Sequence, residues 1–257
     1  MQSKANTHDH TTPRARIRSR YAPAIDTAGE HSLHKNSTHP LESSPSHNMQ
    51  RSNRVASPKQ FSRFNIERMS ASHPAMTKLR RAGHVASIHG NKHWPSADLL
   101  MEFFEEHPLP KRKRVIDLGC GWGLGGIYCA RTYKSKVLAV DADEAVFPYL
   151  QAHAELNGVK IKTHHGDFKS VKGKVLDDVH TVIGSDICFW DELVKPLYKV
   201  IERAMEAGAK RVAIADPGRS PFFKLAEKCA KKYGADLVEL DSEKYPKISG
   251  YVLYVKR

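Results

Sequence analysis

The clearest chemical signature in this chain is a glycine-rich segment followed by an acid. From Val115 the sequence reads Val-Ile-Asp-Leu-Gly-Cys-Gly-Trp-Gly-Leu-Gly-Gly, and a second apolar segment ends at Asp141. Glycines at the end of a strand let a ligand lie against bare backbone, where a Cβ would collide. An acid at the carboxyl end of the next strand is placed to accept hydrogen bonds from ribose hydroxyls. The pattern predicts a site for an adenosine-containing cofactor.

Two templates fit these glycines and imply different cofactors. Gly121, Gly123 and Gly126 satisfy the dinucleotide fingerprint Gly-x-Gly-x-x-Gly, with an acid about 20 residues further on. The second template is Asp117-x-Gly119-x-Gly121-x-Gly123, an acid two residues before three alternating glycines. A dinucleotide site does not need that carboxylate, and burying it is costly unless it is paired. S-adenosylmethionine carries an α-ammonium group that this acid can meet, so the second template favours it over a nicotinamide or a flavin.

The segment Val115–Gly123 resembles the cofactor motif of class I S-adenosylmethionine-dependent methyltransferases. The resemblance implies that Asp117 and the alternating glycines hold the amino-acid part of the cofactor and that Asp141 meets the ribose. It also implies that Asp167 and Phe168 meet the adenine, although a plain turn is the alternative reading of Gly-Asp-Phe. Trp94 stands just before the first helix of the domain, where the family places a tryptophan near the cofactor.

The expected end of the fourth strand bears on the methyl acceptor. Asp186-x-x-Phe189-Trp190 resembles the Asp-x-x-Tyr/Phe-Tyr/Trp pattern of the seven-strand protein lysine methyltransferases. Asp216-Pro-Gly-Arg219 resembles a segment of the group that includes the electron-transfer flavoprotein β-subunit lysine methyltransferase. We therefore assign Asp186 to orienting the nucleophile, and Phe189 and Trp190 to the acceptor pocket. The alternative is that both aromatic side chains pack on the next helix, while Arg219 binds a substrate carboxylate or caps a helix.

A nitrogen acceptor agrees with the types of these residues. Methyl transfer needs a neutral nucleophile, and a lysine has a reference pKa of about 10.4. Aromatic walls lower that pKa by desolvation, and a carboxylate orients the remaining N–H. Phe189 and Trp190 also offer cation–π contacts to a charged side chain. The sequence therefore favours a protein lysine, with a small molecule or RNA as the alternative acceptor.

Strands and helices alternate around these motifs, which predicts a Rossmann-like α/β fold with a mostly parallel seven-stranded sheet and helices on both faces. The last two strands lack room for a crossover helix, so the final strand should pair antiparallel. The expected strands are 114–118, 137–141, 160–164, 179–185, 211–215, 236–240 and 251–255. The expected helices are 96–106, with Ser96 as the cap, 124–133, 144–157, 191–206 and 221–233.

Charge and composition divide the 257 residues into three parts. Residues 1–75 are rich in His and Ser with almost no apolar periodicity, which predicts a disordered basic tail. Residues 76–95 form a basic junction, and residues 96–257 form the methyltransferase domain. The net charge of +13 is concentrated before residue 95, because residues 95–257 hold 26 Lys/Arg against 23 Asp/Glu. A nearly neutral domain argues against nucleic acid as its partner.

The remaining features exclude several classes of protein. Cys120, Cys129, Cys188 and Cys229 show no Cys-x-x-Cys spacing, so neither a metal site nor a disulfide framework is predicted. No apolar run is long enough to cross a bilayer and no secretory segment is apparent, so a cytoplasmic protein is expected. The intact acids and glycines favour an enzyme over a non-catalytic S-adenosylmethionine-binding module. The sequence does not indicate an oligomeric state.

Overall fold

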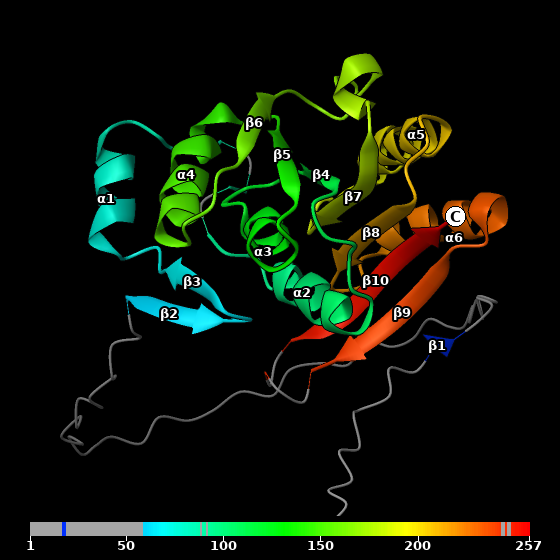
Figure 1. Ribbon diagram of the computed structural model, residues 1–257, viewed down its shortest axis with the longest axis horizontal. Helices are drawn as coiled ribbons and strands as arrows, with labels where there is room; N and C mark the ends of the chain where they lie inside the picture. Colours follow the sequence, from blue (N-terminus) through cyan, green and yellow to red (C-terminus); the bar gives the residue numbers. More distant parts are fainter. Residues whose placement is uncertain (1–16, 19–58, 88, 91, 243–244, 246–247) are drawn as a thin grey trace, which may run out of the picture.

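The structure, a computed structural model, describes residues 17–18, 59–87, 89–90, 92–242, 245 and 248–257. A twisted central sheet is covered by α2, α3 and α4 on one face and by α5 and α6 on the other (Figure 1). Each helix layer buries its own apolar core against the sheet. The predicted Rossmann-like α/β class is confirmed.

The strand order of the main sheet is β1-β9-β10-β8-β7-β4-β5-β6. All neighbours from β6 to β8 pair parallel, whereas β10 lies antiparallel between β8 and β9, as the sequence predicted. The strands are β1 Ile17–Arg18, β4 Arg114–Leu118, β5 Lys136–Asp141, β6 Lys162–His165, β7 Val179–Ser185, β8 Arg211–Asp216, β9 Asp236–Asp241 and β10 Ser249–Lys256. Because the order reverses between β4 and β7, the ends of these two strands mark the switch point where α/β sheets bind ligands.

The helices follow the predicted ranges closely. They are α2 Ser96–Glu106, α3 Leu124–Tyr133, α4 Phe147–Leu156, α5 Asp191–Glu206 and α6 Ser220–Tyr233, with 3₁₀ turns at Glu144–Val146 and Gly173–Leu176. The helix expected over 144–157 is split because Pro148 lies in the first turn of α4, where it offers no backbone N–H. Ser96 is the first helical residue of α2 and not its cap, which is Pro95.

The amino-terminal boundary of the ordered chain differs from the prediction. Residues 59–75, expected in the disordered tail, form the hairpin β2 (Gln60–Arg63) and β3 (Ile66–Met69) and the start of α1 (Pro74–Arg81). These elements are too short to show periodicity in the sequence. They are stabilised by packing against the domain, where Ile66 and Met76 are fully buried. Ile17 and Arg18 of the predicted tail form β1, which pairs antiparallel with β9, and residues 1–16 and 19–58 lie outside the described residues.

Candidate active site

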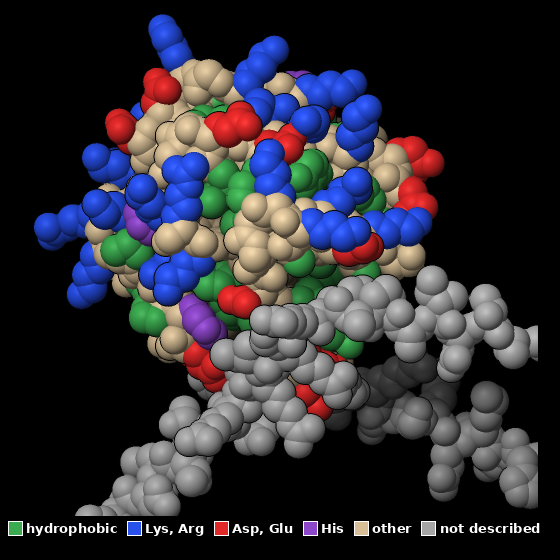
Figure 2. All heavy atoms as spheres, turned by 90° about the vertical axis from the view of Figure 1, so that its right-hand side faces the viewer, with side chains coloured by type: hydrophobic (Ala, Val, Ile, Leu, Met, Phe, Trp, Pro, Cys, Tyr) green, Lys and Arg blue, Asp and Glu red, His purple; other side chains and the backbone are tan. Residues whose placement is uncertain are grey.

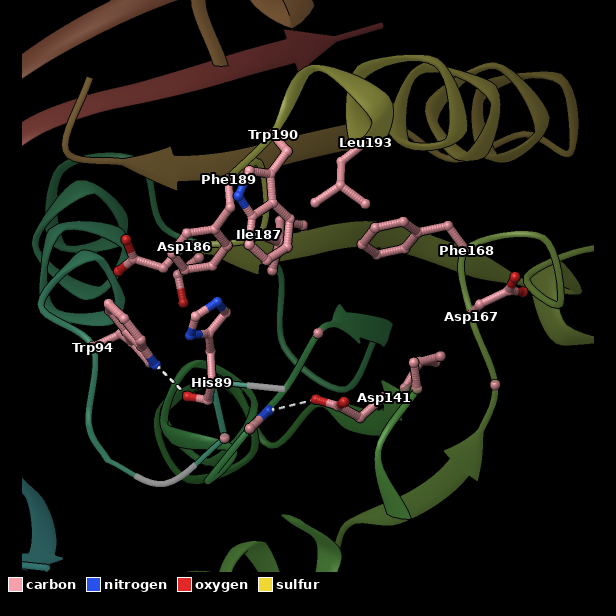
Figure 3. Close-up of a pocket in the computed structure, with 17 residues that line it drawn as sticks. His89, Trp94, Asp141, Asp167, Phe168, Asp186, Ile187, Phe189, Trp190 and Leu193 are labelled. Atoms are coloured by element: carbon pink, nitrogen blue, oxygen red, sulfur yellow. Dashed lines mark hydrogen bonds between the residues drawn. The ribbon is translucent and has the colours of Figure 1, made fainter. Parts of the chain in front are cut away.

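A cavity of about 280 Å³ opens where β4, β5, β6 and β7 end (Figure 3). Its volume is close to the lower limit for ligand pockets, and its walls are mostly apolar. The predicted residues that line it are Trp94, Gly119, Gly121, Asp141, Asp167, Phe168, Asp186, Phe189 and Trp190. The structure therefore brings together residues that the sequence separates by nearly a hundred positions.

Asp141 fixes the glycine loop at the end of β5. Its Oδ2 accepts a hydrogen bond from the Gly121 backbone N–H at 2.9 Å, and its Oδ1 accepts one from Asp143 N–H at 3.0 Å. Burial raises the pKa of this carboxyl, while the two backbone donors act in the opposite direction. The carboxylate thus faces the cavity with its orientation already fixed, as a ribose-binding acid requires (Figure 3).

The first two glycines of the loop keep the ligand side of the backbone bare. Gly119 and Gly121 have φ values of +57° and +50°, a region that side chains disfavour. A Cβ on Gly119 would lie 2.5 Å from the Ile187 side chain, whereas a Cβ on Gly121 would meet no protein atom within 4 Å. Gly121 therefore borders the open space of the cavity.

Two residues predicted to bind cofactor, Asp117 and Gly123, do not line the cavity. The Asp117 carboxylate lies beneath the loop and accepts a hydrogen bond from Gly126 N–H at 2.9 Å. Burial raises its pKa to about 7, and the nearby Asp141 carboxylate acts in the same direction. Gly123 has φ +75°, and a Cβ there would lie 2.6 Å from Leu150. Both residues therefore support the turn from the side that faces away from the cavity.

The expected adenine end is apolar. The Phe168 ring points toward Leu193 and Ile187, while the Asp167 carboxylate points away from the cavity (Figure 3). The Oδ1 of Asp167 accepts hydrogen bonds from the backbone N–H groups of Lys169 and Ser170 at 2.9 and 3.1 Å. In this arrangement Asp167 holds the loop that carries Phe168.

The other end of the cavity is an aromatic cluster of four rings. His89 stacks on Phe189 with ring centroids 4.8 Å apart and lies 5.4 Å from Trp190. Trp94 meets Phe189 edge-on at 5.3 Å and donates its indole N–H to the carbonyl oxygen of His89 at 2.8 Å. Trp190 is half exposed, so the cluster lies at the mouth of the cavity.

Beneath this cluster, Arg219 bridges two buried aspartates. Its guanidinium lies 2.8 Å from Asp186 Oδ1 and 2.7 Å from Asp216 Oδ2, and 4.2 Å over the ring of Phe189. Asp186 Oδ2 also accepts a hydrogen bond from the backbone N–H of Ser96 at 3.1 Å, so it serves the start of α2. Arg219 is the N-cap residue of α6 (Ser220–Tyr233), as one of the two sequence interpretations expected, although its side chain makes no capping hydrogen bond. Its guanidinium instead fixes the position of Phe189.

The segment that carries His89 and Trp94 is anchored to the domain by side chains on both sides. The Asp143 carboxylate accepts hydrogen bonds from the backbone N–H and hydroxyl of Ser87. The indole N–H of Trp122 donates to the carbonyl oxygen of Gly90 at 2.9 Å. Further along, His93 donates from Nε2 to the carbonyl oxygen of Met69 at 2.8 Å. The hairpin and the junction therefore position the aromatic cluster at the mouth of the cavity.

Sequence reasoning missed several residues that line the cavity, among them His89, Ile187 and Leu193. Ile187 and Leu193 read as ordinary core residues, because an apolar side chain after a strand or at the start of a helix has no distinctive pattern. His89 lies next to Gly90, five residues before the predicted Trp94. That neighbouring glycine and the tryptophan were the only local signals, and neither shows that the imidazole faces Phe189.

The chain is similar to known methyltransferases. Residues 115–208 match a family described as a methyltransferase domain. An electron transfer flavoprotein beta subunit lysine methyltransferase of Xenopus laevis is 28% identical over 131 residues, which cover 51% of this chain and 52% of that protein. A histidine protein methyltransferase 1 homolog of Dictyostelium discoideum is 30% identical over 126 residues, covering 47% and 41%. The chain thus spans about half the length of the curated relatives it matches.

Among solved structures, a precorrin 8W decarboxylase of Methanobacterium thermoautotrophicum has the same fold. The TM-score is 0.50 at 14% identity, and the superposition covers 62% of this chain and 90% of the other. The resemblance to class I S-adenosylmethionine-dependent methyltransferases, inferred from Val115–Gly123, is confirmed. S-adenosylmethionine is the cofactor that it implies.

The cavity fits that cofactor in three respects. The space beside Gly121 is open, Asp141 faces it as a ribose acceptor, and an apolar wall including Phe168 and Ile187 suits an adenine ring. In addition, the buried Asp117 carboxyl, with its pKa of about 7, lies beneath the same loop. A cationic group bound above the loop would favour the ionised form of this acid.

Proposed function

We propose that this chain is an S-adenosylmethionine-dependent methyltransferase that methylates a nitrogen atom of a protein side chain, with lysine favoured. The observation that carries the proposal is the continuity of one cavity from Asp141 and the glycine loop to the aromatic cluster of His89, Phe189 and Trp190. One end suits an adenosine and the other a flat or cationic side chain, as methyl transfer between two bound partners requires.

When bound, S-adenosylmethionine supplies an electrophilic methyl group. In our proposal Asp141 binds the ribose, Gly119 and Gly121 bind the amino-acid part, and Phe168, Ile187 and Leu193 enclose the adenine. Asp117 and Gly123 support the loop. Asp167 holds the Phe168 loop through its Oδ1, and because its carboxylate points away from the cavity, direct contact with adenine would require the side chain to turn (Figure 3).

Phe189, Trp190 and Trp94 are proposed to surround the acceptor side chain and exclude water from it. Desolvation by these rings lowers the pKa of a lysine amine and so increases its neutral, nucleophilic fraction. Asp186 acts through Arg219, which fixes Phe189. To orient the nucleophile directly, as expected from the sequence, the Asp186 carboxylate would have to accept a further hydrogen bond on an oxygen that already serves Arg219 or Ser96.

A protein acceptor is supported by the relatives, which include a protein lysine methyltransferase and a protein histidine methyltransferase homolog. A cytoplasmic location is part of the proposal, supported by the four free thiols Cys120, Cys129, Cys188 and Cys229. Within the described residues, no helix is long and apolar enough to span a membrane.

Calorimetry and radiolabelled transfer test the proposal in two steps. The full chain should bind S-adenosylmethionine, and Asp141→Ala should lose that binding. Labelled methyl groups should then enter protease-sensitive material in a cell lysate, and acid hydrolysis should release methyl-lysine. Methylhistidine would shift the acceptor to histidine, and label confined to RNA or small molecules would contradict a protein acceptor. Binding without any transfer would indicate a non-catalytic module.

A further inference from the structure

The edge of the sheet opposite the cavity carries basic residues on strand after strand. Lys113 directly precedes β4, Lys136 begins β5, Lys210 directly precedes β8, and Lys256 and Arg257 lie at the end of β10. Because β10 runs antiparallel to β8, with Lys256 opposite Arg211, its end lies at the same edge where the parallel strands begin. The fold thus gathers basic residues that are spread over almost 150 positions of the sequence.

Backbone contacts show that these residues are neighbours. The backbone N–H of Lys136 donates to the carbonyl oxygen of Lys113 at 2.9 Å, and that of Arg257 donates to the carbonyl oxygen of Lys210 at 3.0 Å. A cavity of about 520 Å³ is lined by Arg112, Lys113, Lys136 and Lys210 together. We call the surface formed by Arg112, Lys113, Lys136, Lys210 and Arg257 the basic edge.

The charges of the basic edge are not neutralised by nearby acids. Among the described residues, no cation of the basic edge lies within 4.0 Å of a carboxylate oxygen, although Asp178 lines the same cavity. The lysines of α6 differ, because Lys224 pairs with Asp191 at 2.6 Å and Lys231 with Glu227 at 2.7 Å. The basic edge therefore presents a net positive field to solvent.

His180 lines the same cavity, and its pKa is affected by the positive charges around it. Burial is the main cause that lowers the pKa of its imidazole, and the charges of Arg211, Lys113 and Lys210 lower it further. Figure 2 looks onto the side of the molecule that lies on the right in Figure 1, and the Lys and Arg side chains visible on it outnumber the Asp and Glu side chains.

We propose that the basic edge binds the phosphate backbone of a nucleic acid without reading its sequence. Lys and Arg side chains that are free of acidic partners can each neutralise a phosphate and release counterions. Among the described residues that line the cavity, the His180 imidazole is the one aromatic ring and Val179 the largest apolar side chain, so there is little to stack on bases or to anchor a protein partner. Phosphate contacts are therefore favoured over base contacts and over an acidic protein.

This partner differs from the methyl acceptor. Strands of five to seven residues separate the basic edge from the cavity, about 16–23 Å along the sheet. A nucleic acid held there leaves the mouth at Trp190 open. The proposal does not depend on methyl transfer. It differs from the expectation drawn from the nearly neutral net charge of the domain, because a net charge does not show that cations are concentrated at one edge of the sheet.

The test is fluorescence anisotropy of the full chain with a labelled 20-base-pair RNA duplex at several salt concentrations. The double variant Lys113→Gln/Lys210→Gln should weaken binding about ten-fold and reduce the slope of log affinity against log salt by about 2. The matched control Lys78→Gln/Arg81→Gln removes two exposed cations from α1, on the far side of the molecule, and should change affinity less than about two-fold. A DNA duplex of the same length shows whether the phosphate backbone is enough for binding without features specific to RNA.

Several outcomes would overturn the proposal. Equal losses for both double variants would assign binding to overall charge, and weakening by Trp190→Ala but not by the basic-edge variant would place the nucleic acid in the active site. Equal affinity for poly-glutamate at the same charge concentration would indicate an acidic protein instead. Unchanged S-adenosylmethionine binding shows that the variants are folded, because Lys113 and Lys210 lie at the opposite edge from that site.

Discussion

The two ends of the active-site cavity are built in different ways. The cofactor end comes from consecutive strand ends and is fixed by backbone hydrogen bonds, as where Asp141 accepts from Gly121 N–H. The acceptor end is assembled from the segment that carries His89 and Trp94 and from the segment that carries Phe189, and side-chain contacts hold the two together. The cofactor end should therefore tolerate changes elsewhere, whereas the acceptor end should depend on distant anchors.

The largest expected effect comes from Arg219, the support of the acceptor end. Arg219→Met leaves the buried carboxylates of Asp186 and Asp216 without their cation, which should lower the free energy of unfolding by about 3–5 kcal/mol. Urea denaturation measures this loss. Lys224→Met is the control, because its exposed pair with Asp191 is worth about 0–1 kcal/mol. Similar losses for both variants would mean that the bridge contributes little.

The next effect separates the two acids of the cofactor end. Asp141→Asn should weaken S-adenosylmethionine binding by about 30- to 100-fold, because an amide cannot accept from Gly121, Asp143 and a ribose together. Asp167→Asn keeps the oxygen that Lys169 and Ser170 need and should change the affinity less than about three-fold. If calorimetry gives equal losses, the Asp167 carboxylate turns into the cavity when cofactor binds.

Lowering the pH should reduce the free energy of unfolding through His93, which helps to anchor the acceptor end. Burial lowers the pKa of this imidazole from 6.5 to about 4, so the folded chain binds fewer protons than the unfolded chain between these values. Its contribution to stability is complete above pH 6.5 and falls as the pH drops, by about 2 kcal/mol at pH 5.

The variant His93→Gln separates the pH-dependent stability that comes from His93 from the part that comes from buried carboxyl groups. His93→Gln retains a donor for the Met69 carbonyl and does not titrate. The difference in unfolding free energy between the natural chain and this variant should therefore narrow by about 2 kcal/mol from pH 7 to pH 5. A difference that stays constant over this range would show that His93 is protonated equally easily in both states.

The smallest expected effect is at Trp190, which is half exposed at the mouth of the cavity. Trp190→Ala should raise KM for the protein acceptor about ten-fold, since one aromatic contact is worth about 1.4 kcal/mol. The dissociation constant for S-adenosylmethionine should stay within about two-fold. The exposed Val85, replaced by alanine, serves as a control that should change neither quantity. A weaker cofactor affinity in Trp190→Ala would show that the two ends are not separate.

The difference between the two ends of the cavity also explains which features could be predicted from the sequence. The fold and the cofactor end were accessible because Asp117, the alternating glycines and Asp141 follow a local rule of strand, turn and strand. The segment from Asp186 to Trp190 was found by its resemblance to known proteins. The directions of the Asp186 and Asp167 carboxylates were not predictable, because they depend on Ser96, Arg219 and the loop at Ser170.

The sequence by itself determined the alternation of strands and helices, the antiparallel last strand and the glycine loop, since each depends on neighbours within a few residues. Only the tertiary structure decided that the hairpin from Gln60 to Met69 is ordered, that His89 faces Phe189, and that the basic edge exists. Those features depend on side chains brought together across the chain. Their energies come from burial and from summed charge, which no local pattern of residues records.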